Sequence, residues 1–148
     1  MSQRISVPAC QRRLAAVWFL GGGLVFAILV IQTFTGHYGD QARDAWGWFL
    51  PTVMPILTLI ASAAAVTGAR SSVRVDALAY HISLGLSVFY LLLVIATIGY
   101  QVFTSLAPAE MIDLMKTSNL WLGPVQTLLG ISLGVFFGTR QHQPDAGE

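Results

Sequence analysis

Charged side chains are scarce in this sequence, and its acidic residues all lie outside the long apolar runs. Charged residues make up 10% of the chain, against roughly 25% in an ordinary soluble domain. The seven acids are Asp40, Asp44, Asp76, Glu110, Asp113, Asp145 and Glu148. Transporters coupled to protons or cations, and proteases with paired intramembrane aspartates, need an ionisable group at membrane depth. The positions of the acids therefore argue against both classes.

Cysteine and histidine are also too few to predict a redox or metal centre. Cys10 is the only cysteine, so the chain can form no intramolecular disulfide. His81 lies about one turn inside an apolar run, and no second histidine stands at a spacing that would ligate haem or a metal. The formal net charge of +1 gives no reason to expect a nucleic acid as partner. We predict no catalytic residue, no cofactor and no metal.

Apolar residues, by contrast, form four long runs that hold more than half of the 148 residues. A helix of about 20 apolar residues, at 1.5 Å rise per residue, matches the ~30 Å hydrocarbon core of a bilayer. We predict an all-α fold, an integral membrane four-helix bundle that forms a single domain over residues 1–148. The spans are expected at about 14–34, 47–66, 78–103 and 120–137.

The basic residues predict how the spans are oriented. With the N-terminus in the cytoplasm, six of the eight basic residues lie inside and only Arg43 and Lys116 lie outside, as the positive-inside rule requires. The six are Arg4, Arg12, Arg13, Arg70, Arg74 and Arg140. The first run is too long for the ~7–15-residue core of a cleavable signal peptide, so we expect it to stay in the mature protein. The prediction is a multi-pass protein of the bacterial inner membrane with both termini cytoplasmic.

The connection before the fourth span has a helical pattern of its own. Pro108 and Glu110 suit a first helical turn. The following apolar residues, Met111, Ile112, Leu114 and Met115, cluster on one side. This pattern predicts a short interfacial helix between helices 3 and 4, lying on the outer membrane surface as a lid or as a recognition element. Ser118 or Asn119 would then cap the fourth span, and Pro124 would fall in its first turn.

Glycine forms the most specific pattern inside the bilayer. Gly123, Gly130, Gly134 and Gly138 recur at helical spacing and lie on one face of the fourth span. A stripe without side chains lets another helix approach closely, which favours helix packing and oligomerisation in membranes. The partner could be a helix of the same chain or of a second copy. Gly21, Gly22 and Gly23 form a second, less periodic thin region in the first span.

Two prolines predict a kink in the second span. Pro51 and Pro55 lie one turn apart, and each removes a backbone donor and crowds the preceding turn. The carbonyl groups near residues 47 and 51 then need other donors, because no water reaches them in lipid. Thr52 and Thr58 are candidates to supply those hydrogen bonds.

The third span is the most polar of the four. Helical spacing places Ser83, Ser87, Tyr90, Thr97 and Gln101 on one stripe, interrupted by Val94. Such a stripe faces protein or water rather than acyl chains. It could line a pore or cavity, or its hydroxyls could bond their own backbone and a neighbouring helix.

Three functional hypotheses follow from these patterns. The first is a small non-enzymatic membrane protein that assembles through helix contacts as a homo-oligomer or with another membrane protein, forming a pore or perturbing the membrane. The second is an accessory subunit that anchors a larger membrane complex. The third is a lipid- or quinone-directed enzyme at the outer surface that uses His37 and Asp40.

Overall fold

Four helices make up most of the computed structural model, which describes residues 4–66, 74–104 and 106–138. They are α1 (Val7–Phe34), α2 (Ala42–Val66), α3 (Ala77–Phe103) and α4 (Pro108–Gly138), with a short 3-10 helix, η1 (Gly39–Gln41), before α2. The predicted all-helical fold is confirmed apart from two three-residue strands, β1 (Arg4–Ser6) and β2 (Arg74–Asp76). α1 and α2 begin several residues before the apolar runs that predicted them.

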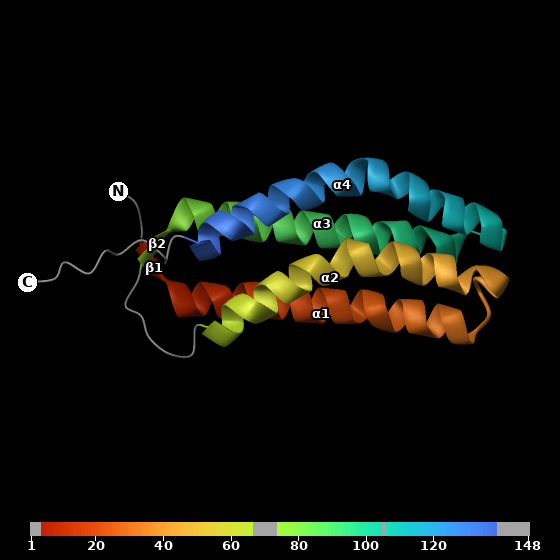
Figure 1. Cartoon of the computed structure of the whole chain (residues 1–148), viewed down its shortest axis with the longest axis horizontal. Helices are drawn as coiled ribbons and strands as arrows, with labels where there is room; N and C mark the ends of the chain where they lie inside the picture. Colours follow the sequence, from red (N-terminus) through yellow and green to blue (C-terminus); the bar gives the residue numbers. More distant parts are fainter. Residues whose placement is uncertain (1–3, 67–73, 105, 139–148) are drawn as a thin grey trace, which may run out of the picture.

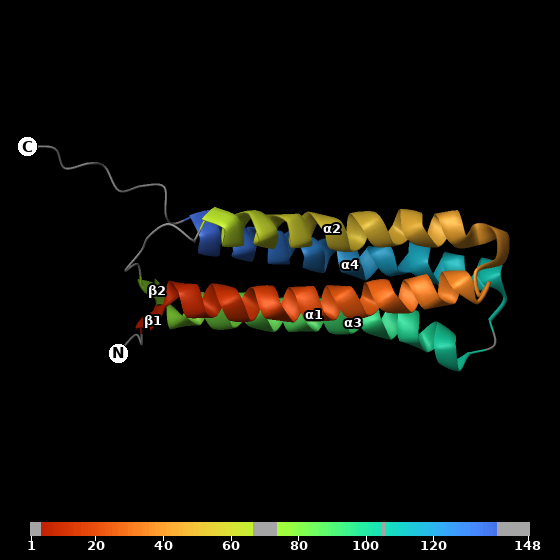
Figure 2. The same ribbon diagram turned by 90° about the horizontal axis from the view of Figure 1, so that it is seen from below.

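The helices lie lengthwise beside one another (Figures 1 and 2). α1 packs against α2 and α3, and α4 packs against the same two helices from the other side. Going around the molecule, the neighbours are therefore α1, α2, α4 and α3. This order places α2 and α3 each between α1 and α4.

The two strands join the beginnings of two helices. β1 pairs with β2 in antiparallel register, with Arg4 opposite Asp76, Ile5 opposite Val75 and Ser6 opposite Arg74. β1 runs directly into α1, and β2 runs directly into α3. The ribbon therefore holds the first turns of α1 and α3 together at one end of the molecule (Figure 1).

Three helices are long and apolar enough to cross a membrane: Cys10–Phe34, Gly39–Ser62 and Ala77–Tyr100. Within the described residues α4 is not among them. Its first turns carry Glu110, Asp113 and Lys116, and Gln126 interrupts its apolar part. The side chains of the apolar residues 135–137 lie outside those the structure describes. A fourth span therefore stays a prediction.

The prediction of a separate interfacial helix between helices 3 and 4 is wrong, because the described residues from Pro108 to Gly138 form one continuous helix. Ser118, expected to cap a new helix, is buried in the middle of α4 and donates its hydroxyl to the carbonyl of Met115 at 2.6 Å. No residue between Glu110 and Trp121 breaks the helical hydrogen-bond pattern, so the surface segment and the fourth apolar run join. Pro124 consequently lies well inside α4 and not in its first turn.

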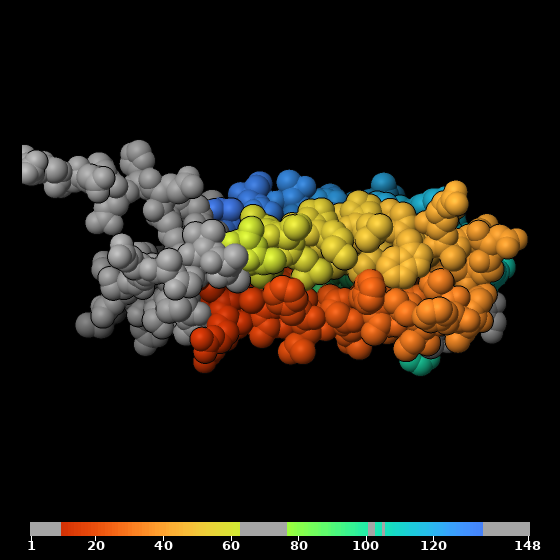
Figure 3. Space-filling view, turned by 60° about the horizontal axis from the view of Figure 1, so that its bottom comes forward, coloured from red at the N-terminus to blue at the C-terminus, as the bar shows by residue number. Residues whose placement is uncertain are grey.

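Large side chains fill the space between the helices. Trp18, Phe49 and Tyr90 are completely buried, and the rings of Trp18 and Tyr90 lie 6.0 Å apart. In the space-filling view α1 and α2 touch along the molecule's length (Figure 3). Many large apolar side chains nevertheless point outward, among them Leu20, which is 75% exposed. Soluble monomers rarely expose so much contiguous apolar surface, whereas a protein surrounded by lipid does.

Candidate functional site

The polar stripe of α3 faces the interior of the molecule. Ser83, Ser87, Tyr90 and Thr97 are all buried, whereas the side chain of Gln101 lies outside those described. The hydroxyls of Ser83 and Ser132 lie 2.7 Å apart and link α3 to α4. Ser87 and Thr97 donate to the carbonyls one turn earlier, at 2.7 and 2.9 Å. These hydroxyls thus have partners in the backbone or a neighbouring helix.

The proline segment of α2 receives hydrogen bonds from two other helices. α2 continues through Pro51 and Pro55, and its axis curves in Figure 1. Residue 55 has no N–H to donate to the carbonyl of Pro51, and the amide nitrogen of Gln126 in α4 donates to that oxygen instead, at 3.1 Å. The phenol of Tyr90 in α3 donates to the next carbonyl, that of Thr52, at 2.8 Å. α2 is therefore tied to α3 and α4 around its prolines.

The two threonines expected to satisfy the freed carbonyls bond elsewhere. Thr52 donates to the carbonyl of Trp48 at 2.6 Å. Thr58 donates to the carbonyl of Met54, with a longer contact of 3.3 Å to that of Pro55. Because a threonine hydroxyl reaches back only three or four residues, neither threonine reaches the carbonyl of Pro51.

The glycine stripe of α4 does not touch another helix of this chain within the described residues. A Cβ added at Gly123, Gly130 or Gly134 would meet no atom within 4 Å, and the surroundings of Gly138 lie outside the described part. Close approach occurs instead at α1. A Cβ at Gly21 would lie 2.7 Å from Cδ1 of Leu91 in α3. The glycines of α1, whose pattern in the sequence was less periodic, are therefore the ones that pack against another helix of the same chain.

Polar groups also gather where α1 ends. Gln32 is buried, and its Oε1 accepts a hydrogen bond of 2.5 Å from the phenol of Tyr38. Burial raises the pKa of Tyr38, so the phenol keeps its proton and acts as the donor. His37 is half-buried, while Asp40 is exposed in η1. The described contacts contain no hydrogen bond between His37 and Asp40, the pair on which the enzyme hypothesis depends.

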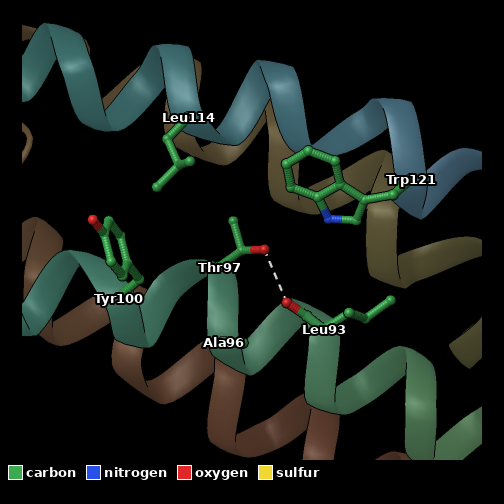
Figure 4. Close-up of a pocket in the computed structure, with 6 residues that line it drawn as sticks. All are labelled: Leu93, Ala96, Thr97, Tyr100, Leu114 and Trp121. Atoms are coloured by element: carbon green, nitrogen blue, oxygen red, sulfur yellow. Dashed lines mark hydrogen bonds between the residues drawn. The ribbon is translucent and has the colours of Figure 1, made fainter.

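Two cavities open at the surface of the helices. One, of about 410 Å³, lies between α3 and α4 in Figure 4 and is lined by Leu93, Ala96, Thr97, Tyr100, Leu114 and Trp121. The hydroxyl of Thr97 is turned to its own helix, to the carbonyl of Leu93, so this wall is mainly apolar. The other, of about 290 Å³, is lined by Ile28, Ile31, Gln32, Thr35 and His37.

Among the described residues no group of three or more histidine, cysteine or acidic side chains could hold a metal ion. No family model, no curated protein and no solved structure matches the chain.

Sequence reasoning passed over two of the three glutamines inside the apolar runs, Gln32 and Gln126. Each makes a side-chain contact that helps to organise its surroundings: Gln32 with Tyr38 and Gln126 with Pro51. The signal was present, because an amide in an otherwise apolar span needs a partner that lipid does not provide.

Proposed function

We propose that this chain is a small non-enzymatic integral membrane protein, a four-helix bundle of the bacterial inner membrane that assembles into oligomers through α4. Three candidate spans and an outward-facing apolar surface support the membrane location. In this proposal α4 is the fourth span, and its apolar part begins after Lys116.

Charge supports an orientation with both termini in the cytoplasm. Arg12 and Arg13 are exposed in the first turns of α1, and Arg4 and Arg74 belong to β1 and β2 at the same end, where α3 begins. Arg43 and Lys116 belong to the first turns of α2 and to the early part of α4, at the opposite end. The end with more basic residues is expected to stay in the cytoplasm.

The observation that carries the assembly proposal is the open glycine stripe of α4. Around Gly123, Gly130 and Gly134 there is room for another helix to reach the backbone directly. Close backbone approach gives dispersion contacts in lipid, where the hydrophobic effect does not drive helix association. The occupant we propose is the same stripe of a second copy, because a two-fold contact between identical surfaces is the commonest way in which chains pair.

A pore, if the oligomer forms one, lies between copies. Within one chain the described interior is filled by Trp18, Phe49 and Tyr90, which are fully buried. These side chains occupy the space between the helices. We therefore assign any membrane permeabilisation to the assembled protein and not to the single chain.

The test is the mass of the purified protein in detergent and in nanodiscs, measured by light scattering. We expect an oligomer for the natural sequence and a monomer for Gly134→Leu. Gly85→Leu in α3 is the matched control, because a Cβ at Gly85 also meets nothing within 4 Å, and it should leave the mass unchanged. A natural protein that is strictly monomeric in both environments contradicts the proposal.

Leakage of dye from liposomes tests the pore separately. Leakage that requires the natural sequence and is lost in Gly134→Leu supports pore formation. If the protein is an oligomer but the liposomes do not leak, the pore hypothesis is excluded and the oligomer hypothesis stands. A monomer that is stable only with one co-purified membrane protein would select the accessory-subunit hypothesis.

A further inference from the structure

Two buried polar groups at the end of α1 have a nitrogen atom without a hydrogen-bond partner. Gln32 is 6% exposed, and its Oε1 is occupied by the phenol of Tyr38, so its Nε2 is left without an acceptor. Nε2 of His37 is likewise buried and unpaired. Leaving a buried donor unsatisfied is unfavourable, and a ligand that accepts the hydrogen bond recovers that cost.

The local backbone holds these two residues together. The N–H of His37 donates to the carbonyl of Gln32 at 2.9 Å, which closes the chain into a turn. The hydroxyl of Thr35 donates back to the carbonyls of Ile31 and Gln32, at 3.0 and 3.1 Å. The ring of His37 also packs edge-on against Tyr38, with centroids 5.8 Å apart. Gln32 is therefore fixed by Tyr38, and His37 is fixed beside it.

Both residues line the same cavity, whose remaining walls are mostly apolar. It measures about 290 Å³, and Ile28, Ile31 and Thr35 complete the lining. Ile31 is 61% exposed, so the cavity lies beside the surface that lipid would cover at the end of a candidate span. Its volume falls at or below the lower end of the ~300–1,000 Å³ typical of pockets that enclose a whole small molecule. It suits one end of a larger molecule that continues into the bilayer.

We propose that Gln32 and His37 bind the carbonyl oxygen of a long-chain membrane amphiphile, whose hydrocarbon lies against Ile28 and Ile31. The amide nitrogen of Gln32 is a donor, and the imidazole of His37 supplies a second donor when Nε2 carries the proton. A cavity lined by two residues with unpaired donor nitrogens calls for an acceptor oxygen. No lysine or arginine lines the cavity, so the site offers no charge to a phosphate or carboxylate. An uncharged carbonyl fits best.

A carbonyl on a long chain has two sources in a membrane: the ester of a glycerophospholipid and the ring of an isoprenoid quinone. The proposed binding site does not depend on oligomer formation, because every residue of the site belongs to α1 or to the turn after it. It also requires no reaction, since binding alone satisfies the two nitrogens.

The experiment uses the full chain in detergent and measures binding of three probes by calorimetry. The probes are a short-chain ester phosphatidylcholine, its ether-linked analogue without carbonyls, and a decyl-substituted benzoquinone. We expect saturable binding of the ester lipid or the quinone, and about tenfold weaker binding of the ether analogue, because one hydrogen bond of typical strength is lost. Whichever probe binds identifies the source of the carbonyl.

Variants connect the binding to the two side chains. Gln32→Leu and His37→Phe should each weaken binding of the carbonyl probe about tenfold. Thr58→Val is the matched control, because the hydroxyl of Thr58 likewise bonds carbonyls of its own helix but Thr58 is not among the residues that line the cavity, and it should bind as the natural protein does. Circular dichroism checks that each variant folds. If Gln32→Leu does not fold, His37→Phe alone tests whether the site binds the carbonyl probe. Saturable binding of ester and ether lipid with equal affinity, no saturable binding of either carbonyl probe, or binding unchanged in both variants would overturn the proposal.

Discussion

The amide nitrogen of Gln126 lies 3.1 Å from the carbonyl oxygen of Pro51 and donates a hydrogen bond to it across the contact between α4 and α2. That oxygen lacks its usual helical donor because residue 55 is a proline. Since lipid offers no donor, the hydrogen bond has to come from another helix or from water. Pro55 in α2 thereby leaves a carbonyl free, and this carbonyl is where Gln126 of α4 bonds to α2.

Replacing Gln126 by leucine should destabilise the folded protein by about 1 kcal/mol, the order found for single hydrogen bonds between membrane helices. The loss should be smaller when Pro55 is also replaced by alanine, because the restored N–H can bond to the carbonyl of Pro51. A double-mutant cycle of Gln126→Leu and Pro55→Ala, followed by denaturation in mixed micelles, measures this coupling. Equal costs of Gln126→Leu with and without Pro55 would show that the bond does not depend on the proline.

Enlarging Gly21 should disturb the packing of α1 on α3. An added Cβ at Gly21 would lie 2.7 Å from Leu91, whereas one at Gly23 would meet nothing within 4 Å. We expect Gly21→Leu to cost about 1–3 kcal/mol through overpacking. Gly23→Leu, the matched control, should be neutral or slightly stabilising because leucine favours the helix. Thermal unfolding of the two variants measures both costs. A larger loss of stability in Gly23→Leu than in Gly21→Leu would show that α1 presents a different face to α3.

The protein should lose stability in alkaline solution partly through Tyr38. Burial raises the pKa of Tyr38 above the value of about 10 found in unfolded chains. The folded state therefore holds this proton more tightly, and the associated stability is complete below about pH 10 and falls as the pH rises beyond it. Tyr38→Phe should show a shallower decline than the natural protein in thermal scans from neutral to strongly alkaline pH. Tyr100→Phe, which alters an exposed ring, should decline as the natural protein does.

The α3 stripe should be closed to water in the single chain. Ser87 is fully buried, and its hydroxyl donates to the backbone carbonyl of Ser83. In a Cys10→Ala background, Ser87→Cys should resist charged thiol reagents, while Asp40→Cys in the exposed η1 turn should react completely. Rapid labelling of Ser87→Cys in the assembled protein would instead mean that the stripe lines a water-filled path.

Sequence patterns predicted the helices well because apolar runs determine where a chain can be buried in lipid. They placed the ends of three spans at Phe34, Val66 and Phe103, where the structure also ends its helices. They placed a helix start correctly at Pro108, but they were misled at Ser118, which looked like a second boundary and lies inside α4. Composition shows where polarity changes, but a helix continues through such a change unless its backbone hydrogen bonds are interrupted.

Partners across helices were harder to predict than the helices. Pro55 indicated that a carbonyl would be free, yet nothing along the sequence identifies Gln126, 71 residues later, as the donor. Similarly, the indole N–H of the buried Trp48 in α2 donates to the hydroxyl of Ser118 in α4 at 3.1 Å, a partner that the sequence does not indicate. These contacts depend on which helices are neighbours and on how each is rotated, and periodicity alone gives neither.

The ribbon between β1 and β2 has a consequence for how the protein is made. Residues 4–6 leave the ribosome early, but their partners at 74–76 appear only after α1 and α2 have been synthesised. The N-terminal strand must therefore wait, unpaired, while the first two helices enter the membrane. Pairing of the two strands then closes a loop that contains α1 and α2, so the strand pair can form only after both helices have been synthesised.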